Sequence, residues 1–319
     1  MLFAYRLEGG RLSRLEPDAD LAQAIWIDLY RPLPEQVTQL AALGVEVPTL
    51  PDMEEIEISS RLYREVGADV MTVMLPGTTP DKTQVSGPVT FILTKERLVT
   101  VRHHAPRPFE TFPGRAERSS AGCVNHLRLF MGLVEDIVAR QADLLEGVGR
   151  ALDDATAALF GEEQARRPDQ LQVLLVAIGR QGEVLARVRL GLVTLERMLS
   201  VYMLWVDDKR ESIGMRALIK GQIRDIQALE VHADFMSGRV GMVTDTTLGM
   251  VNLAQNATIR IVSVVAALFL PPTVIASAYG MNFARMPELE WKWGYPMALS
   301  MMVGSALATW LYFKWKRWL

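Results

Sequence analysis

The sequence predicts an α/β domain at the N-terminus, then long α-helices, then a C-terminal hairpin of two membrane-spanning helices. Short runs rich in Val, Ile, Phe and Thr alternate with helical runs over residues 1–120. Apolar residues then recur every three to four positions over residues 121–257. Two long uncharged segments follow within residues 258–319. These three ranges are the expected domains.

The first 120 residues indicate an α/β layer domain with a mixed sheet. Two helices are expected at Pro34–Leu43 and Asp52–Ser60, because proline and acidic residues stand at the start of each. Residues 60–75 and 89–101 each have the pattern of a β-hairpin. The runs expected to form strands are Leu2–Leu7, Ala24–Leu29, Val70–Leu75, Val89–Leu93 and Leu98–Val101.

Long helices are predicted from Cys123 onward. One precedes a break at Gly161–Pro168 and a second follows it, and we expect the two to pack as an antiparallel hairpin. A third helical pattern begins near Glu211 and meets no proline before Pro271, so one helix should run continuously into the membrane. The expected core positions are Phe130, Val134, Ile137, Leu144, Val148 and Leu152, then Leu171, Leu175, Ile178, Leu185, Val188, Leu192, Leu195 and Leu199.

The membrane part is predicted from two segments, Ile261–Ala278 and Gly294–Phe313, which carry no charged residue. A membrane-spanning helix needs about 20 mostly apolar residues. Lys314, Lys316 and Arg317 follow the second segment, which places the C-terminus in the cytoplasm by the positive-inside rule. The N-terminus has no signal-peptide pattern and is also expected in the cytoplasm, so the connector should face outward.

Composition excludes several classes of function. The net charge of −3 and the lack of long Lys/Arg runs give no indication of a nucleic-acid partner. A single cysteine, Cys123, excludes an internal disulfide and fits a reducing compartment. The four histidines are scattered and are expected to be surface or helix residues rather than zinc ligands. No phosphate-binding glycine loop or nucleophile elbow is recognisable, so we expect neither an enzyme nor a nucleotide ligand.

A line of small and polar residues follows one face of the third helix. Its steps alternate between four and three residues, which is the spacing of a seam in a helical bundle. Close packing of small residues between helices in lipid would explain such a line. Small polar groups around a water-filled axis between symmetric copies would explain it equally well. The line comprises Asp245, Gly249, Asn252, Asn256, Ile259, Ser263, Ala266, Leu270, Thr273 and Ser277.

Several short motifs lie in and around the connector: Phe269-Leu270-Pro271-Pro272-Thr273, Tyr279-Gly280-Met281-Asn282-Phe283, Met286-Pro287-Glu288-Leu289, Trp293-Gly294-Tyr295-Pro296 and the closing Tyr312-Phe313-Lys314 to Trp318-Leu319. Together they resemble the CorA family of magnesium channels. Weaker similarity extends upstream through Trp26-Ile27-Asp28-Leu29 and Glu54-Glu55-Ile56-Glu57. It therefore covers essentially the whole chain.

The resemblance implies a homopentameric cytoplasmic funnel, with five copies of the first span around a pore in the inner membrane. Tyr279, Gly280, Met281 and Asn282 match the family's signature at the outer entrance, and Glu288 and Glu290 lie in the outer loop. By position, the pore-lining residues are Asp245, Asn252, Asn256, Ile259, Val262, Ala266, Leu270, Thr273 and Ser277, with Ile259 and Val262 at the hydrophobic constriction.

The family closes its pore when intracellular Mg²⁺ binds at acidic pairs between subunits. By resemblance, Glu54 and Glu55 match one partner of such a pair. Asp225 is the best candidate for the other partner, although it is equally well interpreted as an ordinary solvated carboxylate. The spans contain no Asp, Glu or His, which suits an ion that keeps its water shell. A ring of amide and carbonyl oxygens can hydrogen-bond such a shell without trapping the ion.

We therefore expect a magnesium-selective channel that imports hydrated Mg²⁺ and is gated by intracellular Mg²⁺. One alternative is a transporter of Zn²⁺, Co²⁺ or Ni²⁺ in the same superfamily. Another is a membrane-anchored sensor or scaffold in which the hairpin serves only as an anchor. Expected partners are divalent metal ions, membrane lipid and further copies of the chain.

Overall fold

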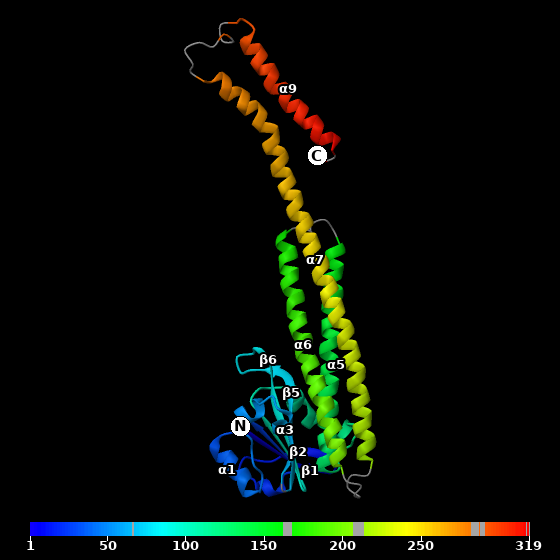
Figure 1. Ribbon diagram of the computed structural model, residues 1–319. Coiled ribbons are helices and arrows are strands. Elements are labelled where there is room, and N and C mark those ends of the chain that lie inside the picture. Colours follow the sequence, from blue (N-terminus) through cyan, green and yellow to red (C-terminus); the bar gives the residue numbers. More distant parts are fainter. Residues whose placement is uncertain are drawn as a thin grey trace. The chain divides into compact units, whose positions relative to one another are not determined.

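The computed structural model describes residues 1–65, 67–161, 168–206, 214–281, 287, 291–316 and 318, without the side chains of Ile58 and Ser59. The chain forms two compact units (Figure 1). The first comprises Met1–Ala157 and Val176–Thr244, and the second comprises Ala158–Leu175 and Asp245–Leu319.

The first unit contains a mixed sheet of seven strands within the described residues, in the order β2-β1-β3-β7-β6-β5-β4. Strands β3 and β7 are parallel, and all the other neighbours are antiparallel. The predicted hairpins are therefore correct, as β4–β5 and β6–β7. The strands are β1 (Leu2–Glu8), β2 (Arg11–Arg14), β3 (Trp26–Tyr30), β4 (Leu62–Glu65), β5 (Ala68–Thr78), β6 (Gln84–Thr94) and β7 (Leu98–Arg102).

Short helices lie in the connections between the strands and after the last strand. The prediction of one helix over Asp52–Ser60 is wrong. The range Asp52–Ser60 forms two helices, α2 (Leu50–Glu54) and α3 (Ile58–Arg61). Thr49 and Asp52 cap the start of α2, and Glu55 ends it with ψ 137°, an extended conformation that no helix continues through. The others are η1 (Leu21–Gln23), α1 (Pro34–Ala42), α4 (Pro108–Thr111), η2 (Phe112–Gly114) and η3 (Ala116–Arg118).

The two faces of the sheet have different cores, because side chains alternate along each strand. On β3, Ile27 and Leu29 belong to an aliphatic cluster that includes Leu40 of α1 and Met53 of α2. Trp26 belongs to an aromatic cluster on the opposite face. The aromatic contacts are Trp26–Phe112 at 5.9 Å, Phe91–Phe130 at 5.4 Å and Phe130–Tyr202 at 5.3 Å between ring centroids.

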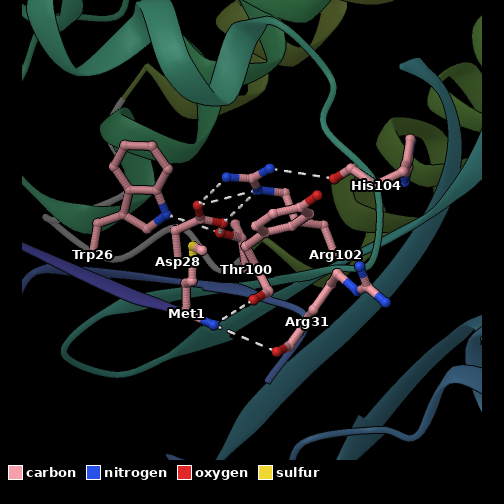
Figure 2. A network of polar contacts seen from close by, with 8 residues as sticks. Met1, Trp26, Asp28, Arg31, Thr100, Arg102 and His104 are labelled. Carbon is pink, nitrogen blue, oxygen red and sulfur yellow. Dashed lines mark hydrogen bonds and ion pairs between the residues drawn. The ribbon is translucent and has the colours of Figure 1, made fainter. Parts of the chain in front are cut away.

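A buried ion pair lies on the aromatic face of the central strands, as Figure 2 shows. Arg102 donates to both carboxylate oxygens of Asp28, with Nη2 at 2.9 Å from Oδ2 and Nε at 3.2 Å from Oδ1. Thr100 donates to Asp28 Oδ1 at 2.7 Å and accepts from the indole of Trp26 at 3.1 Å. The guanidinium also lies 4.6 Å from the ring centroid of Tyr30. Every buried charge in this network is therefore paired.

His104 departs from the expectation of a surface residue. It is buried, and its Nε2 lies 2.9 Å from the Leu75 carbonyl oxygen. A Cβ at Gly77 or Gly87 would come within 2.7 Å of the imidazole, so the two glycines leave the space that the ring occupies. Burial lowers the pKa of His104 to about 4. The imidazole is therefore neutral at physiological pH and donates its N–H to the carbonyl.

Most of α5 (His126–Phe160), most of α6 (Pro168–Trp205) and the first part of α7 (Met215–Tyr279) complete the first unit. Figure 1 shows α5, α6 and the first part of α7 side by side. Ion pairs join α7 to its neighbours, from Arg239 to Asp153 of α5 at 2.6 Å and from Asp234 to Arg189 of α6 at 2.9 Å. The predicted core spacing is correct except at Leu144 and Leu175, which are only partly buried; next to the first of these, Leu145 is fully buried instead.

Helix α6 is attached directly to the sheet. Strand β4 covers β5 only as far as Met71, which leaves the following edge of β5 without a strand neighbour. There the Thr194 hydroxyl accepts from the Met74 N–H at 3.1 Å and lies 3.4 Å from the Met74 carbonyl oxygen. Farther along, Thr78 and Ala105 exchange two main-chain hydrogen bonds. These contacts occupy main-chain groups along the uncovered edge of β5.

The second unit contains the end of α7 and helix α9 (Gly294–Trp315). Helix α7 is continuous over 65 residues and includes Pro271 and Pro272, as the sequence predicts. Both helices are long and apolar enough to cross a membrane, and only 6% of each apolar window is buried within the chain. Apolar helix surface this exposed requires lipid or further protein to cover it.

Candidate functional site

The line of small and polar residues predicted on α7 is exposed along its full length. All ten positions from Asp245 to Ser277 are exposed in the single chain, including Leu270 at 67% and Ile259 at 62%. Val262, assigned to the constriction by resemblance, is exposed at 63%. The less exposed positions lie on a different face, which includes buried Val264 and partly covered Leu268, Pro271 and Ile275. The line is thus not used for packing within one chain.

Two of the hydroxyl groups on this line, those of Ser263 and Thr273, are already oriented by the helix. Ser263 donates to the carbonyl oxygen of Ile259 at 2.8 Å, and Thr273 donates to that of Phe269 at 2.6 Å. Each hydroxyl hydrogen is therefore occupied, and the oxygen lone pairs remain available as acceptors. The water molecules around a cation direct their hydrogens outward. Acceptor oxygens along the line therefore have the polarity that a hydrated cation needs.

A recess borders the line near the start of the apolar segment. It has a volume of about 470 Å³ and is lined by Asn256, Ile259 and Ser263 together with Arg260 and Trp318. Arg260 lies beside these residues because it follows Ile259 on the same helix, whereas the sequence did not indicate that Trp318 would. An arginine next to a cation path would repel the ion, whereas the Asn256 amide can accept hydrogen bonds from its water shell.

The outer end of α7 is described as far as Met281. The helix ends at Tyr279, and the Gly280 N–H donates to the Ala276 carbonyl at 3.0 Å. Gly280 does not adopt a left-handed conformation, so a positive φ is not the reason for glycine here. A Cβ on it would lie 3.2 Å from the Ala276 oxygen, which makes the position tight. Asn282, Glu288 and Glu290 lie outside the described residues.

The three acidic residues predicted to bind regulatory Mg²⁺ are exposed in the first unit. Glu54 ends α2, Glu55 follows it, and Asp225 lies on α7. Glu54 lies near His103, whose pKa is lowered by burial and by Arg31 and raised by Glu54. Within the part of the chain that the structure describes, no three His, Cys, Asp or Glu side chains form a metal-ligand group. One chain alone thus supplies isolated carboxylates rather than a complete set of ligands.

The chain was compared with known proteins by sequence and by structure. The family model described as "CorA-like Mg2+ transporter protein" matches residues 22–317. Proteins named "Magnesium transport protein CorA" from Yersinia pestis and Pectobacterium atrosepticum are 32% and 33% identical, each over 100% of both chains.

The structure of the CorA magnesium transporter from Methanocaldococcus jannaschii has the same fold, with a TM-score of 0.72 and 16% sequence identity. The match covers 100% of this chain and 99% of that one. The family match spans nearly the whole sequence, including the exposed line on α7 and both apolar helices. This chain belongs to the CorA-like Mg²⁺ transporter family.

Proposed function

We propose that this chain is one subunit of a magnesium-selective channel, in which the exposed line on α7 faces a water-filled pore. The observation that carries the proposal is a row of exposed polar and small residues on α7, which continues into an apolar segment of that helix that is almost uncovered in the single chain. Lipid offers no donor to the hydroxyl oxygens of Ser263 and Thr273, so these exposed acceptors favour water on that face. The family consists of ion transporters, and an enzymatic role is therefore not assigned.

Enclosing such a pore requires several copies of the chain, because two membrane helices cannot surround an aqueous path. Five copies is the number that the family resemblance implies. In that assembly α9 would face lipid, in agreement with its exposed Leu299, Val303, Leu307 and Leu311. Lys314 and Lys316 follow the second span and favour cytoplasmic termini in the inner membrane.

Selectivity would come from retaining the water shell of Mg²⁺. Mg²⁺ loses its waters reluctantly, so a row of acceptors can pass the hydrated ion without binding it tightly. We place Asn282 at the outer entrance with Tyr279, Gly280 and Met281, and Glu288 and Glu290 as nearby acidic residues that attract cations. Asn252 and Asp245 continue the path on the cytoplasmic side, beyond the apolar positions Ile259, Val262, Ala266 and Leu270. Where the apolar stretch is narrow, it would stop conduction by excluding water.

Two alanines on α7 provide a matched test of the pore-facing line. Ala266 lies on the line and Ala276 lies off it, and both are exposed in the single chain. Ten residues separate them, so their side chains point about 80° apart around the helix axis. In liposomes containing purified protein, Ala266→Leu should reduce Mg²⁺ uptake at least about tenfold by narrowing the pore, whereas Ala276→Leu should leave it near wild type. Equal uptake by the two variants would show that the line does not face the pore.

Further variants in the same assay test the entrance and the ion. Asn282→Ala should also abolish most uptake, and unchanged uptake would disprove our assignment of the entrance. Zn²⁺, Co²⁺ and Ni²⁺ should each inhibit Mg²⁺ uptake less than the same concentration of additional Mg²⁺ does. Stronger inhibition by one of them would indicate a transition-metal transporter. A purified protein that moves no ion at all would support a membrane-anchored scaffold instead.

Regulation by intracellular Mg²⁺ is the final part of the proposal. We infer that carboxylates of Glu54 or Glu55 meet Asp225 of a neighbouring copy, since isolated carboxylates on one chain need a partner to form a divalent site. Glu55→Ala and Asp225→Ala should weaken the protection that Mg²⁺ gives against proteolysis of the cytoplasmic part. Glu35→Ala, an exposed acid on α1, serves as the control. Unaltered protection in both variants would exclude these residues.

A further inference from the structure

A small pocket lies in the first unit, where α6 passes the uncovered edge of β5. It has a volume of about 240 Å³. Its walls come from the segment before β4, from β5 and from α6, three regions far apart in the sequence. The aliphatic lining residues are Ile56, Leu62 and Val193. Ile56 is 87% exposed, so a ligand in the pocket could cover apolar surface on it.

Two arginines at this pocket are available to a ligand. Arg61 uses its Nε to donate to the Glu55 carbonyl, and no other hydrogen bond of its guanidinium exists within the described residues. Arg197, on α6, is exposed and has no ion pair or hydrogen bond to any residue in the described ranges. None of the described residues that line the pocket is acidic. The pocket thus has a positive charge that the chain itself does not neutralise.

A buried hydroxyl at the pocket has an unused hydrogen. Thr72 is 5% exposed and lines the pocket, and its Oγ1 lies 2.7 Å from Oγ1 of fully buried Thr90. Two hydroxyls carry two hydrogens, and their mutual hydrogen bond uses one of them. No other acceptor for the pair lies among the described residues. If Thr90 donates to Thr72, the Thr72 O–H is free to donate into the pocket, where a ligand oxygen could accept it.

We propose that this pocket binds a small organic anion with one carboxylate and a short branched aliphatic body. Guanidinium groups form the strongest hydrogen bonds with planar oxyanions, and Arg61 and Arg197 would hold the carboxylate from the two sides of the pocket. Thr72 adds a neutral donor. The aliphatic body would cover Ile56, Leu62 and Val193, and the volume lies below the range of about 300–1,000 Å³ typical of larger ligands. This site is independent of the ion path proposed above.

The test uses the full chain in lipid nanodiscs and 3-methylbutanoate as the probe. Ligand-observed NMR should show saturable binding with a dissociation constant on the order of 1 mM, above the signal from empty nanodiscs. The neutral isostere 3-methylbutanamide should bind at least about tenfold more weakly, because it loses the charge-assisted hydrogen bonds. Inorganic phosphate should compete poorly, since it cannot cover the aliphatic wall.

Variants connect the binding to this pocket. Arg197→Gln should weaken binding about tenfold or more, whereas Arg180→Gln, an exposed arginine elsewhere on α6, should not change it. Thr72→Val should weaken binding, and Thr72→Ser should bind like wild type. Arg197→Gln should unfold at the same temperature as wild type, because the Arg197 side chain is exposed. Absence of saturable binding, equal binding of the amide, equally strong competition by phosphate, or an unaffected Arg197→Gln variant would each overturn the proposal.

Discussion

Replacing Asp28 by alanine should destabilise the first unit strongly, because the buried Arg102 guanidinium would lose its counterion. The Arg102 side chain is only 4% exposed, and Asp28 accepts hydrogen bonds from its Nε and Nη2. In Asp28→Ala the guanidinium keeps its contact with the His104 carbonyl at 3.2 Å and with the rings of Tyr30 and Phe109. None of these groups carries a compensating negative charge, so the guanidinium would be buried without a counterion.

The expected loss in the free energy of unfolding follows from the burial of the Asp28–Arg102 ion pair. Breaking a buried ion pair by removing one partner lowers the free energy of unfolding by about 3–5 kcal/mol, and the remaining ring and carbonyl contacts favour the lower end of that range. For a unit of this size, 1 kcal/mol corresponds to about 2–4 °C in melting temperature. We therefore expect Asp28→Ala to melt about 10 °C below wild type.

Thermal unfolding of the purified full chain in detergent, followed by tryptophan fluorescence, measures this shift. Trp26 is a suitable reporter because its indole donates to Thr100 in the same network. Glu8→Ala is the control, since the Arg6–Glu8 pair is about half exposed and should contribute only about 0–1 kcal/mol. The double variant Asp28→Leu with Arg102→Met should recover most of the loss. The reasoning is refuted if Asp28→Ala and Glu8→Ala melt within about 2 °C of each other.

Two further predictions concern residues that join the sheet to its surroundings. Unfolding should become easier by about 3 kcal/mol as pH falls from about 6.5 to about 4, because His104 takes up a proton on unfolding over that range. His104→Gln keeps an N–H donor for Leu75 and should flatten the pH profile of the melting temperature; an unchanged profile would contradict this. Gly191→Ala should destabilise by about 1–3 kcal/mol, because a Cβ there would lie 2.7 Å from Gln141 Nε2 and 3.3 Å from the Met74 carbonyl oxygen. In Gly179→Ala on the same helix, the added Cβ meets open space, and the variant should be more stable by about 0.5–1 kcal/mol. If the two variants shift the melting temperature in the same direction, the close packing of Gly191 against Gln141 and Met74 is contradicted.

Much of the fold could be predicted from the sequence because hydrophobic spacing determines it. The continuous helix α7, the mixed sheet and both apolar helices follow from periodicity. Strand β2 was missed because Arg11–Arg14 contains no β-branched or aromatic residue. Gly9 and Gly10, with φ of 56° and 82°, form the two-residue turn that pairs it with β1, and this Gly-Gly turn was the available signal.

The candidate site was predictable only in part. The line on α7 repeats at helical spacing and could therefore be recognised without a structure. The Arg61–Arg197–Thr72 pocket could not, because its members come from α3, α6 and β5 and meet only through the tertiary fold. The split of Asp52–Ser60 into two helices depends on the extended backbone at Glu55, which apolar spacing does not encode.

The attachment of Thr194 to Met74 has a consequence for the oligomer that we propose. A bare sheet edge can recruit the edge of another molecule, and that danger grows when identical subunits are held close to one another. Here a threonine hydroxyl from the chain's own helix and the Ala105 main chain occupy the groups on which a foreign strand would dock. In the oligomer that we propose, the sheets of neighbouring copies would therefore not pair along this part of β5.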